Sequence, residues 1–243
     1  RLHAMSRFIT KAAVILPFER ELLSNAGIDT TFVGHPLLDR ATNLPSREEA
    51  RRRLGLPVNG EVLALFPGSR AQEIARHLDG FVAVARELER RRPGLTVIVS
   101  GAPTVEFGAQ SPYPIVPSAS FDVLRAANVA LCKSGTTTLE AAVAGCPCAI
   151  VYRTSAVSYF IASRLVKIPN IGLLNIVAGR RVVPEFVQDA FVTADVADAL
   201  DPLFDERGAR RAAMVADLAV VRTRLGEAGA SARVAALASG MLR

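Results

Sequence analysis

The sequence predicts an α/β fold in which helices pack on a parallel β-sheet. Short, fully apolar runs such as Val62–Phe66 and Val129–Cys132 are typical of strands that are buried on both faces. Each of these runs is followed by a small polar loop and then by a helical pattern. The 243 residues are 50% hydrophobic, which is enough to build a substantial core.

The first forty residues predict two short strands and one helix. Ala12–Leu16 and Thr31–Val33 are apolar, β-prone runs, and Pro17–Ala26 between them is helical in pattern. Because two strands and a helix cannot close a core, we expect the chain to start inside a domain whose earlier part is absent. His35, which precedes a proline, is expected to be a structural loop residue in an extended or turn conformation.

A linker and a basic helix come next, and they lead into the first buried strand. Ser46 is the expected N-cap of the helix Arg47–Leu54. The strand Val62–Phe66 then runs into the small-residue loop Pro67–Arg70, and an amphipathic helix is predicted over Ala71–Arg92. This is the first of two strand-loop-helix junctions in the chain.

Arg70 in that loop has two interpretations. The fork of its guanidinium matches phosphate oxygens, so it could bind an anion. It could equally be a surface residue that pairs with Glu73 on its own helix. Beyond this helix the sequence predicts a strand, a Pro- and Gly-rich loop with a possible edge strand in it, and a helix. These segments are Leu95–Val99, Gly101–Ser118, Pro114–Val116 and Phe121–Ala127.

The stretch from residue 128 to residue 148, NVALCKSGTTTLEAAVAGCPC, holds the second strand-loop-helix junction. The strand Val129–Cys132 is followed by a polar loop, a helix to Ala144 and a stop at Gly145–Pro147. Ligands sit at this end of parallel strands, and a helix N-terminus attracts anions. The alternative is purely structural, because Thr137 and Glu140 also fit a capping box that would only start the helix.

After a further strand, Ala149–Tyr152, the sequence predicts mainly helices. Arg153 follows that strand directly and is another candidate to bind phosphate. Asn175 lies inside an apolar run and therefore needs a hydrogen-bond partner if it is buried. The predicted helices are Ala156–Lys167, a short one over Val182–Gln188, and an Ala-rich helical tail from Asp195 to Leu242 that breaks near Gly208 and Gly226.

Composition excludes several classes of protein. The net charge is +6, mostly from arginine clusters, which is typical either of solvated helix faces or of an anionic partner. The chain has no Trp, so stacking platforms for nucleic acid are poorly supplied. No apolar run approaches the about 18 residues of a membrane span, and no signal peptide is visible. Three Cys make no disulfide framework, so we expect a cytoplasmic protein.

Motifs spread over nearly the whole chain carry a specific resemblance. They are LPFE (16–19), VGHPLLD (33–39), PGSRAQEI (67–74), KSGTTTLE (133–140), YRTS (152–155), LVK (165–167), NIVAGRRVVPEFVQ (175–188) and LGEAGAS (225–231). In this order they resemble the lipid-A-disaccharide synthases, which are inverting glycosyltransferases of the GT-B architecture.

The resemblance implies two Rossmann-like domains with the active site between them. In this chain it implies a remnant of the N-terminal, acceptor-side domain over residues 1–45, a nucleotide-sugar-binding domain over 46–225, and a final helix over 226–243. The implied reaction joins UDP-2,3-diacylglucosamine to 2,3-diacylglucosamine 1-phosphate (lipid X) and releases UDP. The lipid substrates imply a peripheral location on the cytoplasmic face of the inner membrane, with a homodimer as one arrangement.

No metal or other cofactor is implied, and the chain has no Asp-x-Asp motif. Two departures from the family pattern stand out. We expect most of the family's N-terminal domain to be absent from this chain, and the resemblance places the acidic general base in that domain. Leu174 also stands where the family usually has Pro.

The resemblance and the loops together give a set of expected site residues. Positive potential on the diphosphate is expected from Arg70 and from the helix starts after Ser69 and Ser134–Thr136. Glu140 is expected to accept hydrogen bonds from ribose hydroxyls. The full set is Ser69, Arg70, Glu73, Ser134, Gly135, Thr136, Glu140, Arg153, Asn175 and Gln188.

Three alternatives remain open from the sequence. Another GT-B enzyme, such as the peptidoglycan glucosaminyltransferase, would have Gly-Gly-Ser where this chain has Pro67–Arg70. A UDP-sugar epimerase would need more catalytic His and acidic residues than three His readily allow. A catalytically incompetent fragment that only binds UDP-sugar is the third.

Overall fold

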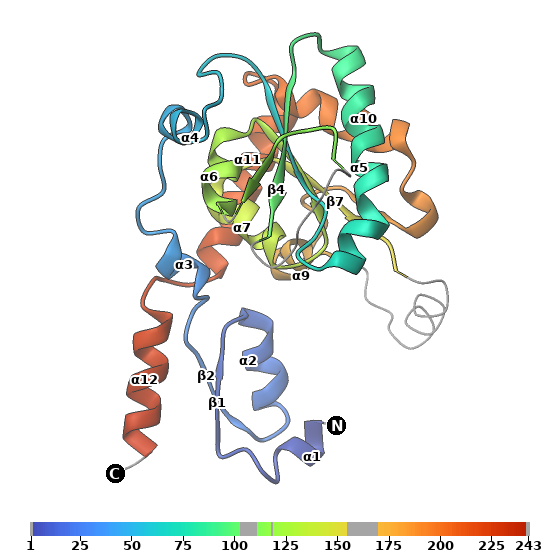
Figure 1. The fold of residues 1–243 in the computed structure, drawn as a ribbon. Coiled ribbons are helices and arrows are strands. Elements are labelled where there is room, and N and C mark those ends of the chain that lie inside the picture. The colour runs from blue at the N-terminus through green and yellow to red at the C-terminus, as the bar shows by residue number, and fades with distance from the viewer. Residues whose placement is uncertain (1, 103–110, 118, 155–169, 242–243) are drawn as a thin grey trace. The chain divides into compact units, whose positions relative to one another are not determined.

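The computed structural model describes residues 2–102, 111–117, 119–154 and 170–241, and it divides into two compact units (Figure 1). The larger unit is Leu44–Ala219, and the smaller one combines Arg1–Asn43 with Val220–Arg243. The predicted helix over 156–167, Ser155 and the motif at 165–167 lie outside the described residues, as does part of the loop over 101–118.

The larger unit is built on a parallel sheet, as the apolar runs predict. Its strand order is β5-β4-β3-β6-β7-β8, and every pairing in it is parallel. The strands are β3 Val62–Phe66, β4 Thr96–Gly101, β5 Ile115–Pro117, β6 Val129–Lys133, β7 Cys148–Tyr152 and β8 Glu185–Val187. The β3 and β6 side chains in the sheet centre are almost wholly buried, because helices cover both faces.

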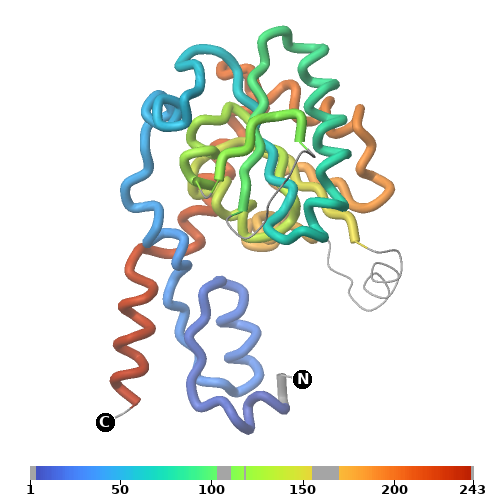
Figure 2. The backbone as a smooth tube through the Cα atoms, in the orientation of Figure 1, coloured from blue at the N-terminus to red at the C-terminus, as the bar shows by residue number. Residues whose placement is uncertain are grey.

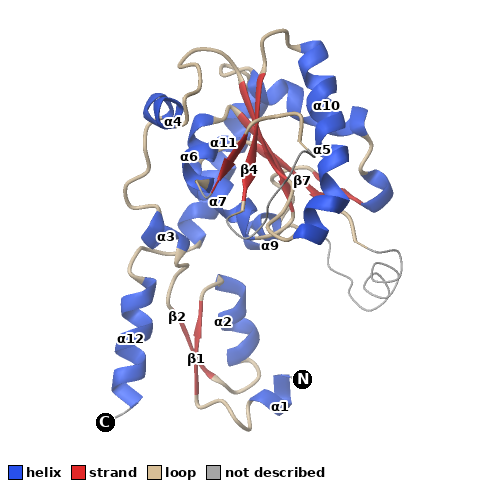
Figure 3. Cartoon of the chain, in the orientation of Figure 1, coloured by secondary structure: helices blue, strands red, loops and turns tan. Residues whose placement is uncertain are grey.

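Helices cover the two faces of this sheet in separate layers (Figure 3). On one face α5 packs beside α10, and on the other α6 packs against both α4 and α7. The bounds are α4 Arg47–Arg53, α5 Ala71–Arg91, α6 Ser120–Ala126, α7 Thr136–Ala144, α9 Leu173–Ala178, α10 Thr193–Leu200 and α11 Ala209–Arg224, with short 3-10 turns η2 Gln188–Ala190 and η3 Asp201–Phe204.

Local sequence signals set several helix ends. The Ser46 hydroxyl accepts a hydrogen bond from the backbone N–H of Glu49 at 3.1 Å, so it caps α4 as predicted. Gly145 ends α7 with φ 68°, a left-handed conformation that glycine adopts without strain. The possible edge strand predicted within the 101–118 loop is confirmed as β5.

One predicted element is wrong. We expected a helix over Val182–Gln188, but residues Glu185–Val187 form strand β8 and a 3-10 turn follows it. The reason is tertiary, because the outer edge of β7 offers hydrogen bonds that a local pattern does not reveal. The carbonyl of Pro184 accepts from the N–H of Ile150 at 2.9 Å, and an edge strand tolerates a proline at its start.

The smaller unit contains segments from both ends of the chain (Figure 2). Its described elements are α1 Leu2–Met5, β1 Lys11–Val14, α2 Pro17–Ser24, β2 Asp29–Phe32, α3 Leu37–Arg40, the end of α11 and α12 Ala230–Met241. Strands β1 and β2 pair in parallel. The Asp39 carboxylate accepts hydrogen bonds from the backbone N–H groups of Gly229 and Ala230, which fastens the start of α12 to α3.

Candidate functional site

The centre of the sheet in the larger unit is a topological switch point. β3 and β6 are neighbours, but the chain leaves β3 towards β4 and leaves β6 towards β7, in opposite directions. In sheets of this kind, ligands bind beyond the carboxyl ends of the two strands that flank the switch point. The two loops that the sequence singled out, Pro67–Arg70 and Lys133–Gly135, follow these two strands.

The first junction, between β3 and α5, is filled by its own acidic residue. The Glu73 carboxylate accepts a hydrogen bond from the backbone N–H of Ser69 at 3.0 Å. Gly68 has φ 141°, and a Cβ added there would lie 2.6 Å from the Cβ of Glu73. Only glycine therefore lets the loop pass this close to Glu73.

Arg70 projects from the same junction into solvent. Its side chain is 81% exposed, and a guanidinium nitrogen lies 3.4 Å from Glu73 Oε1. The pairing with Glu73 therefore exists but is long and exposed, and the anion-binding role of Arg70 stays a prediction. An exposed pair of this kind contributes little to stability, so the guanidinium is available for another anion.

Lys133 links the two junctions. Its Nζ lies 2.9 Å from Glu73 Oε1, and both side chains are only 16% exposed. Burial raises the pKa of Glu73, but the hydrogen bonds from Lys133 and Ser69 outweigh it and hold the pKa below its ordinary value. Lys133 is not among the expected site residues, and the one sequence signal for it is a lysine that directly follows the apolar run Val129–Cys132.

Within the part of the chain that the structure describes, no side chain caps the helix at the second junction, between β6 and α7. Gly135 is the N-cap of α7, no side chain caps the helix, and its first turn has no acidic residue. The buried Thr138 hydroxyl turns back onto the carbonyl of Gly135 at 2.8 Å, so it does not occupy the N–H groups. The exposed Thr136 begins the helix. The first N–H groups of such a helix attract an anion.

The capping box that we considered for this helix is wrong. It requires Thr137 as the N-cap, but the helix begins one residue earlier and Gly135 is the N-cap. Glu140 is therefore the fifth helical residue and cannot reach back to the N-cap as a box requires. It is buried inside the unit, at 7% exposure, and its ribose role stays a prediction.

The side chains of Ser134 and His77 hold neighbouring loops in place. The Ser134 hydroxyl donates to the carbonyl of Ile171 at 3.2 Å. The buried ring of His77 bridges α5 and the segment after β7: Nε2 accepts from the N–H of Arg153 at 3.0 Å, so Nδ1 donates to the carbonyl of Glu73 at 2.7 Å. Burial lowers the pKa of His77, which keeps the ring neutral in this role.

Arg153 and Gln188 both serve the segment that follows β7. The Arg153 guanidinium stacks 4.4 Å from the centre of the Phe191 ring and donates to the Phe191 carbonyl at 3.0 Å. The Gln188 amide pairs with the backbone of Thr154 in both directions, at 2.9 and 3.2 Å. In the free chain both residues hold structure, and their ligand roles stay predictions.

Asn175 has a structural role in the free chain, and its ligand role stays a prediction. Its side chain is fully buried, and it does find the partners that a buried amide needs. The amide nitrogen donates to the carbonyl of Val183 and to Glu185, and the oxygen accepts from the N–H groups of Val182 and Val183. These four hydrogen bonds use the capacity of the side chain, so Asn175 shapes the turn before β8.

Glu185 is a structural acid that the sequence analysis did not identify. Its two oxygens accept from the N–H groups of Ile171 and Gly172, at the start of α9. A carboxylate is favoured there by the helix dipole. Across the described residues no group of three His, Cys, Asp or Glu side chains is placed to hold a metal ion.

Comparison with known proteins decides the family. The family model for lipid-A-disaccharide synthetase matches residues 1–231. The chain belongs to the lipid-A-disaccharide synthetase family. The resemblance that the motifs carry is therefore confirmed.

Curated relatives in this family align with the whole chain. The lipid-A-disaccharide synthase of Anaeromyxobacter sp. (strain K) is 37% identical over 252 residues, covering 100% of this chain and 65% of the relative. That of Geobacter sulfurreducens is 35% identical over 255 residues, with the same coverage. The chain thus spans 65% of the length of these family members.

Solved structures show the fold. A glycosyltransferase from Rickettsia africae matches with a TM-score of 0.51 at 13% identity, covering 89% of this chain and 58% of that one. A Listeria monocytogenes structure assigned as a UDP-N-acetylglucosamine 2-epimerase has a TM-score of 0.55 at 13% identity, covering 92% and 57%. The family and these neighbours confirm an α/β fold of the GT-B type. Among the helices that the structure describes, none combines the length and apolarity of a membrane span.

Proposed function

We propose that this chain binds the nucleotide-sugar donor of an inverting glycosyltransferase in lipid A biosynthesis. The donor is UDP-2,3-diacylglucosamine, the acceptor is 2,3-diacylglucosamine 1-phosphate, and the products are the lipid A disaccharide 1-phosphate and UDP. Membership of the lipid-A-disaccharide synthetase family supports this reaction. The GT-B fold is compatible with this reaction, but a fold alone does not identify the substrates.

One observation carries the proposal: the open N-terminus of α7 lies at the switch point beside the Lys133–Glu73 pair. We place the diphosphate of UDP against the N–H groups at Gly135 and Thr136. Arg70 supplies a movable guanidinium from the neighbouring loop. Negative charge grows on the diphosphate as the bond between C1 and oxygen breaks, and fixed positive potential at this place stabilises that charge.

The proton of the acceptor hydroxyl needs a separate base. Glu73 is poorly suited, because its pKa is held below the ordinary value and its carboxylate already accepts hydrogen bonds from Lys133 and Ser69. We therefore assign the general base to a part of the enzyme beyond these residues. Because both substrates are lipids, we also propose that the enzyme works as a peripheral protein at the inner face of the inner membrane.

The test has two measurements. Calorimetry with UDP in the presence of EDTA should give saturable binding, because the site uses backbone N–H groups and guanidinium rather than a metal. A transfer assay with the two lipid substrates then tests the reaction. An absolute requirement for a divalent metal would contradict the proposed site. Binding of UDP without sugar transfer would favour the alternative that this chain only binds the nucleotide sugar.

A further inference from the structure

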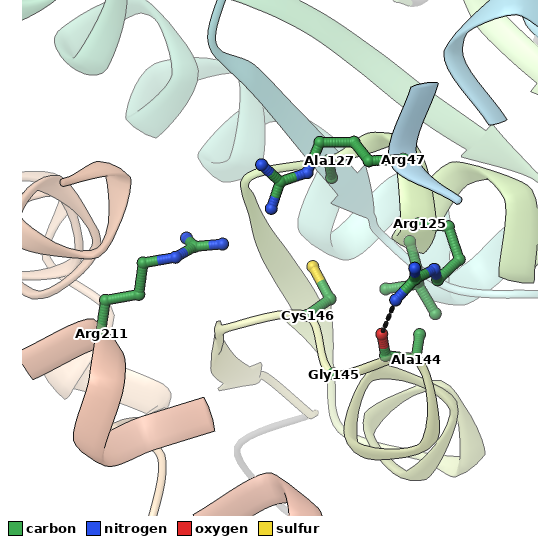
Figure 4. Close-up of a pocket in the computed structure, with 8 residues that line it drawn as sticks. Arg47, Arg125, Ala127, Ala144, Gly145, Cys146 and Arg211 are labelled. Atoms are coloured by element: carbon green, nitrogen blue, oxygen red, sulfur yellow. Dashed lines mark hydrogen bonds between the residues drawn. The ribbon is translucent and has the colours of Figure 1, made fainter. Parts of the chain in front are cut away.

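Three arginines from separate helices line a small cavity at the amino ends of the central strands (Figure 4). Arg47 comes from α4, Arg125 from α6 and Arg211 from α11, and the cavity of about 110 Å³ also borders Cys146. Figure 4 shows the guanidinium groups of Arg47 and Arg211 directed towards one another above the Cys146 sulfur. The volume holds a few water molecules or one small oxyanion.

Arg211 is buried without a carboxylate. The residue is only 7% exposed, and Nη1 donates to the backbone carbonyls of Asn128 at 2.8 Å and Leu203 at 2.6 Å. No Asp or Glu of the described residues forms an ion pair with it. A buried charge normally has an ionic partner, since its desolvation is costly. Carbonyl oxygens satisfy hydrogen bonds, but they do not neutralise the charge.

Arg125 repeats this arrangement on the other side of the cavity. Its Nε donates to the carbonyl of Pro45 at 2.8 Å, and Nη1 donates to that of Ala144 at 3.0 Å. Ala144 is the last residue of α7, whose carbonyl end would repel an anion. The guanidinium of Arg125 covers that end and turns it into a positive wall of the cavity.

The local charges do not balance. Arg47 pairs with the exposed Glu206, whereas Arg125 and Arg211 form no ion pair with any carboxylate of the described residues. Burial and the nearby charge of Arg47 lower the pKa of Arg211, and the carboxylate of Glu206 only partly opposes this shift. Cys146 does not supply the missing negative charge, because burial raises the pKa of its thiol to about 12.

We propose that this cavity binds a phosphate-type oxyanion, either inorganic phosphate or the phosphate of a small monoester. Guanidinium forks match tetrahedral oxyanions, and three arginines line this cavity. The cavity is separate from the proposed nucleotide site. Asn128 and Cys146 precede β6 and β7, so it lies at the amino ends of these strands, whereas the nucleotide site lies at their carboxyl ends.

The test is calorimetric titration with inorganic phosphate at constant ionic strength. The wild-type chain should bind one phosphate, and Arg47→Ala should weaken that binding at least tenfold. Glu206→Gln should strengthen it, because the substitution removes the carboxylate that competes for Arg47. Arg52→Ala is the matched control: Arg52 lies on the same helix, pairs with Glu48 and does not line the cavity. A parallel titration with glycerol 3-phosphate identifies the source, since tighter binding of the monoester indicates a monoester ligand.

Several results would overturn the proposal. One is the absence of saturable phosphate binding in the wild-type chain. Another is equal weakening by Arg52→Ala, which would indicate a general charge effect. Arg70→Ala provides the third: if it abolishes phosphate binding while Arg47→Ala does not, the anion sits at the switch point. Melting curves of all variants should stay close to wild type, since the substituted side chains are largely at the surface.

Discussion

The two strand-loop-helix junctions at the switch point look alike in sequence but differ in what occupies the helix start. At β3–α5, Glu73 turns back to accept the N–H of Ser69 and the ammonium of Lys133. At β6–α7 no side chain caps the helix, and Gly135 leaves its N-terminus open. The chain thus places its own carboxylate at one junction, whereas among the described residues no side chain caps the helix at the other.

A small-residue loop before a helix therefore indicates a possible anion site. It does not show whether a side chain of the protein already occupies that site. The deciding residue lies in the first turn of the helix. A glutamate three residues into α5 fills that junction, whereas α7 begins with three threonines and has no acid in its first turn.

The largest effect is expected from Gly68→Ala. The substitution combines a positive φ with a Cβ 2.6 Å from that of Glu73, and together these should cost about 3 kcal/mol of stability. Gly135→Ala is the matched control, because its Cβ would meet nothing closer than Lys133 Nζ at 3.9 Å. It should cost only about 1–2 kcal/mol of stability but weaken UDP binding. Urea unfolding measures the stability of the two variants, and calorimetry measures their UDP affinity. Equal losses of stability in the two variants would contradict the difference between the junctions.

Lys133→Met should lower the free energy of unfolding by about 2–3 kcal/mol, since it leaves Glu73 partly buried beside only an exposed arginine. Arg90→Met is the control, because Arg90 forms an exposed ion pair with Glu87 on α5, and an exposed pair of this kind contributes little to stability. If the two variants are equally stable, the pair that links the junctions has no special role.

Arg70→Ala should reduce UDP affinity by about 1.5–3 kcal/mol through the loss of a charge-assisted hydrogen bond. The melting temperature should hardly change, because the side chain is 81% exposed and makes only a long contact with Glu73. Arg76→Ala, on the exposed face of the same helix, controls for the loss of one positive charge. Unchanged UDP affinity with a lower melting temperature would make Arg70 purely structural.

Glu140→Gln should reduce UDP affinity by about 1 kcal/mol or more if Glu140 holds the ribose, with little change in the melting temperature. Gln keeps the shape of the buried side chain while removing its charge. Thr137→Ala is a companion variant. A capping Thr would cost about 1 kcal/mol when replaced, and we expect no such loss because Gly135 is the N-cap. Wild-type affinity in Glu140→Gln would remove this residue from the site.

The smallest effect is a pH dependence of the Lys133→Met difference. The folded-state pKa of Glu73 lies below its ordinary value of 4.5, so its contribution to stability is present above that pH and is lost as pH falls through the folded pKa. The stability gap between wild type and Lys133→Met should therefore narrow on acidification from pH 7 to below 4.5. Denaturant titrations at several pH values measure the gap, and a constant gap would contradict the electrostatic origin.

The sequence predicts helices and strands well, but it does not predict which side chains come together at a site. The buried strands, α5 and the Gly145 stop follow from patterns within one segment. Strand β8 does not, because it forms only against the edge of β7. Asn175 shows the same limit, since its motif indicates importance but its partners come from a turn seven to ten residues away. Lys133 contacts Glu73 only because β6 lies next to β3 in the sheet, and the sequence alone does not reveal that neighbour.

The clamp of Asp39 on Gly229 also affects how the chain is made. These two residues are 190 positions apart, and the whole larger unit lies between them. At synthesis rates of about 5–20 residues per second, a ribosome needs roughly 10 to 40 seconds to produce that interval. The larger unit can therefore fold while translation continues, whereas the smaller unit waits for the last helix to emerge.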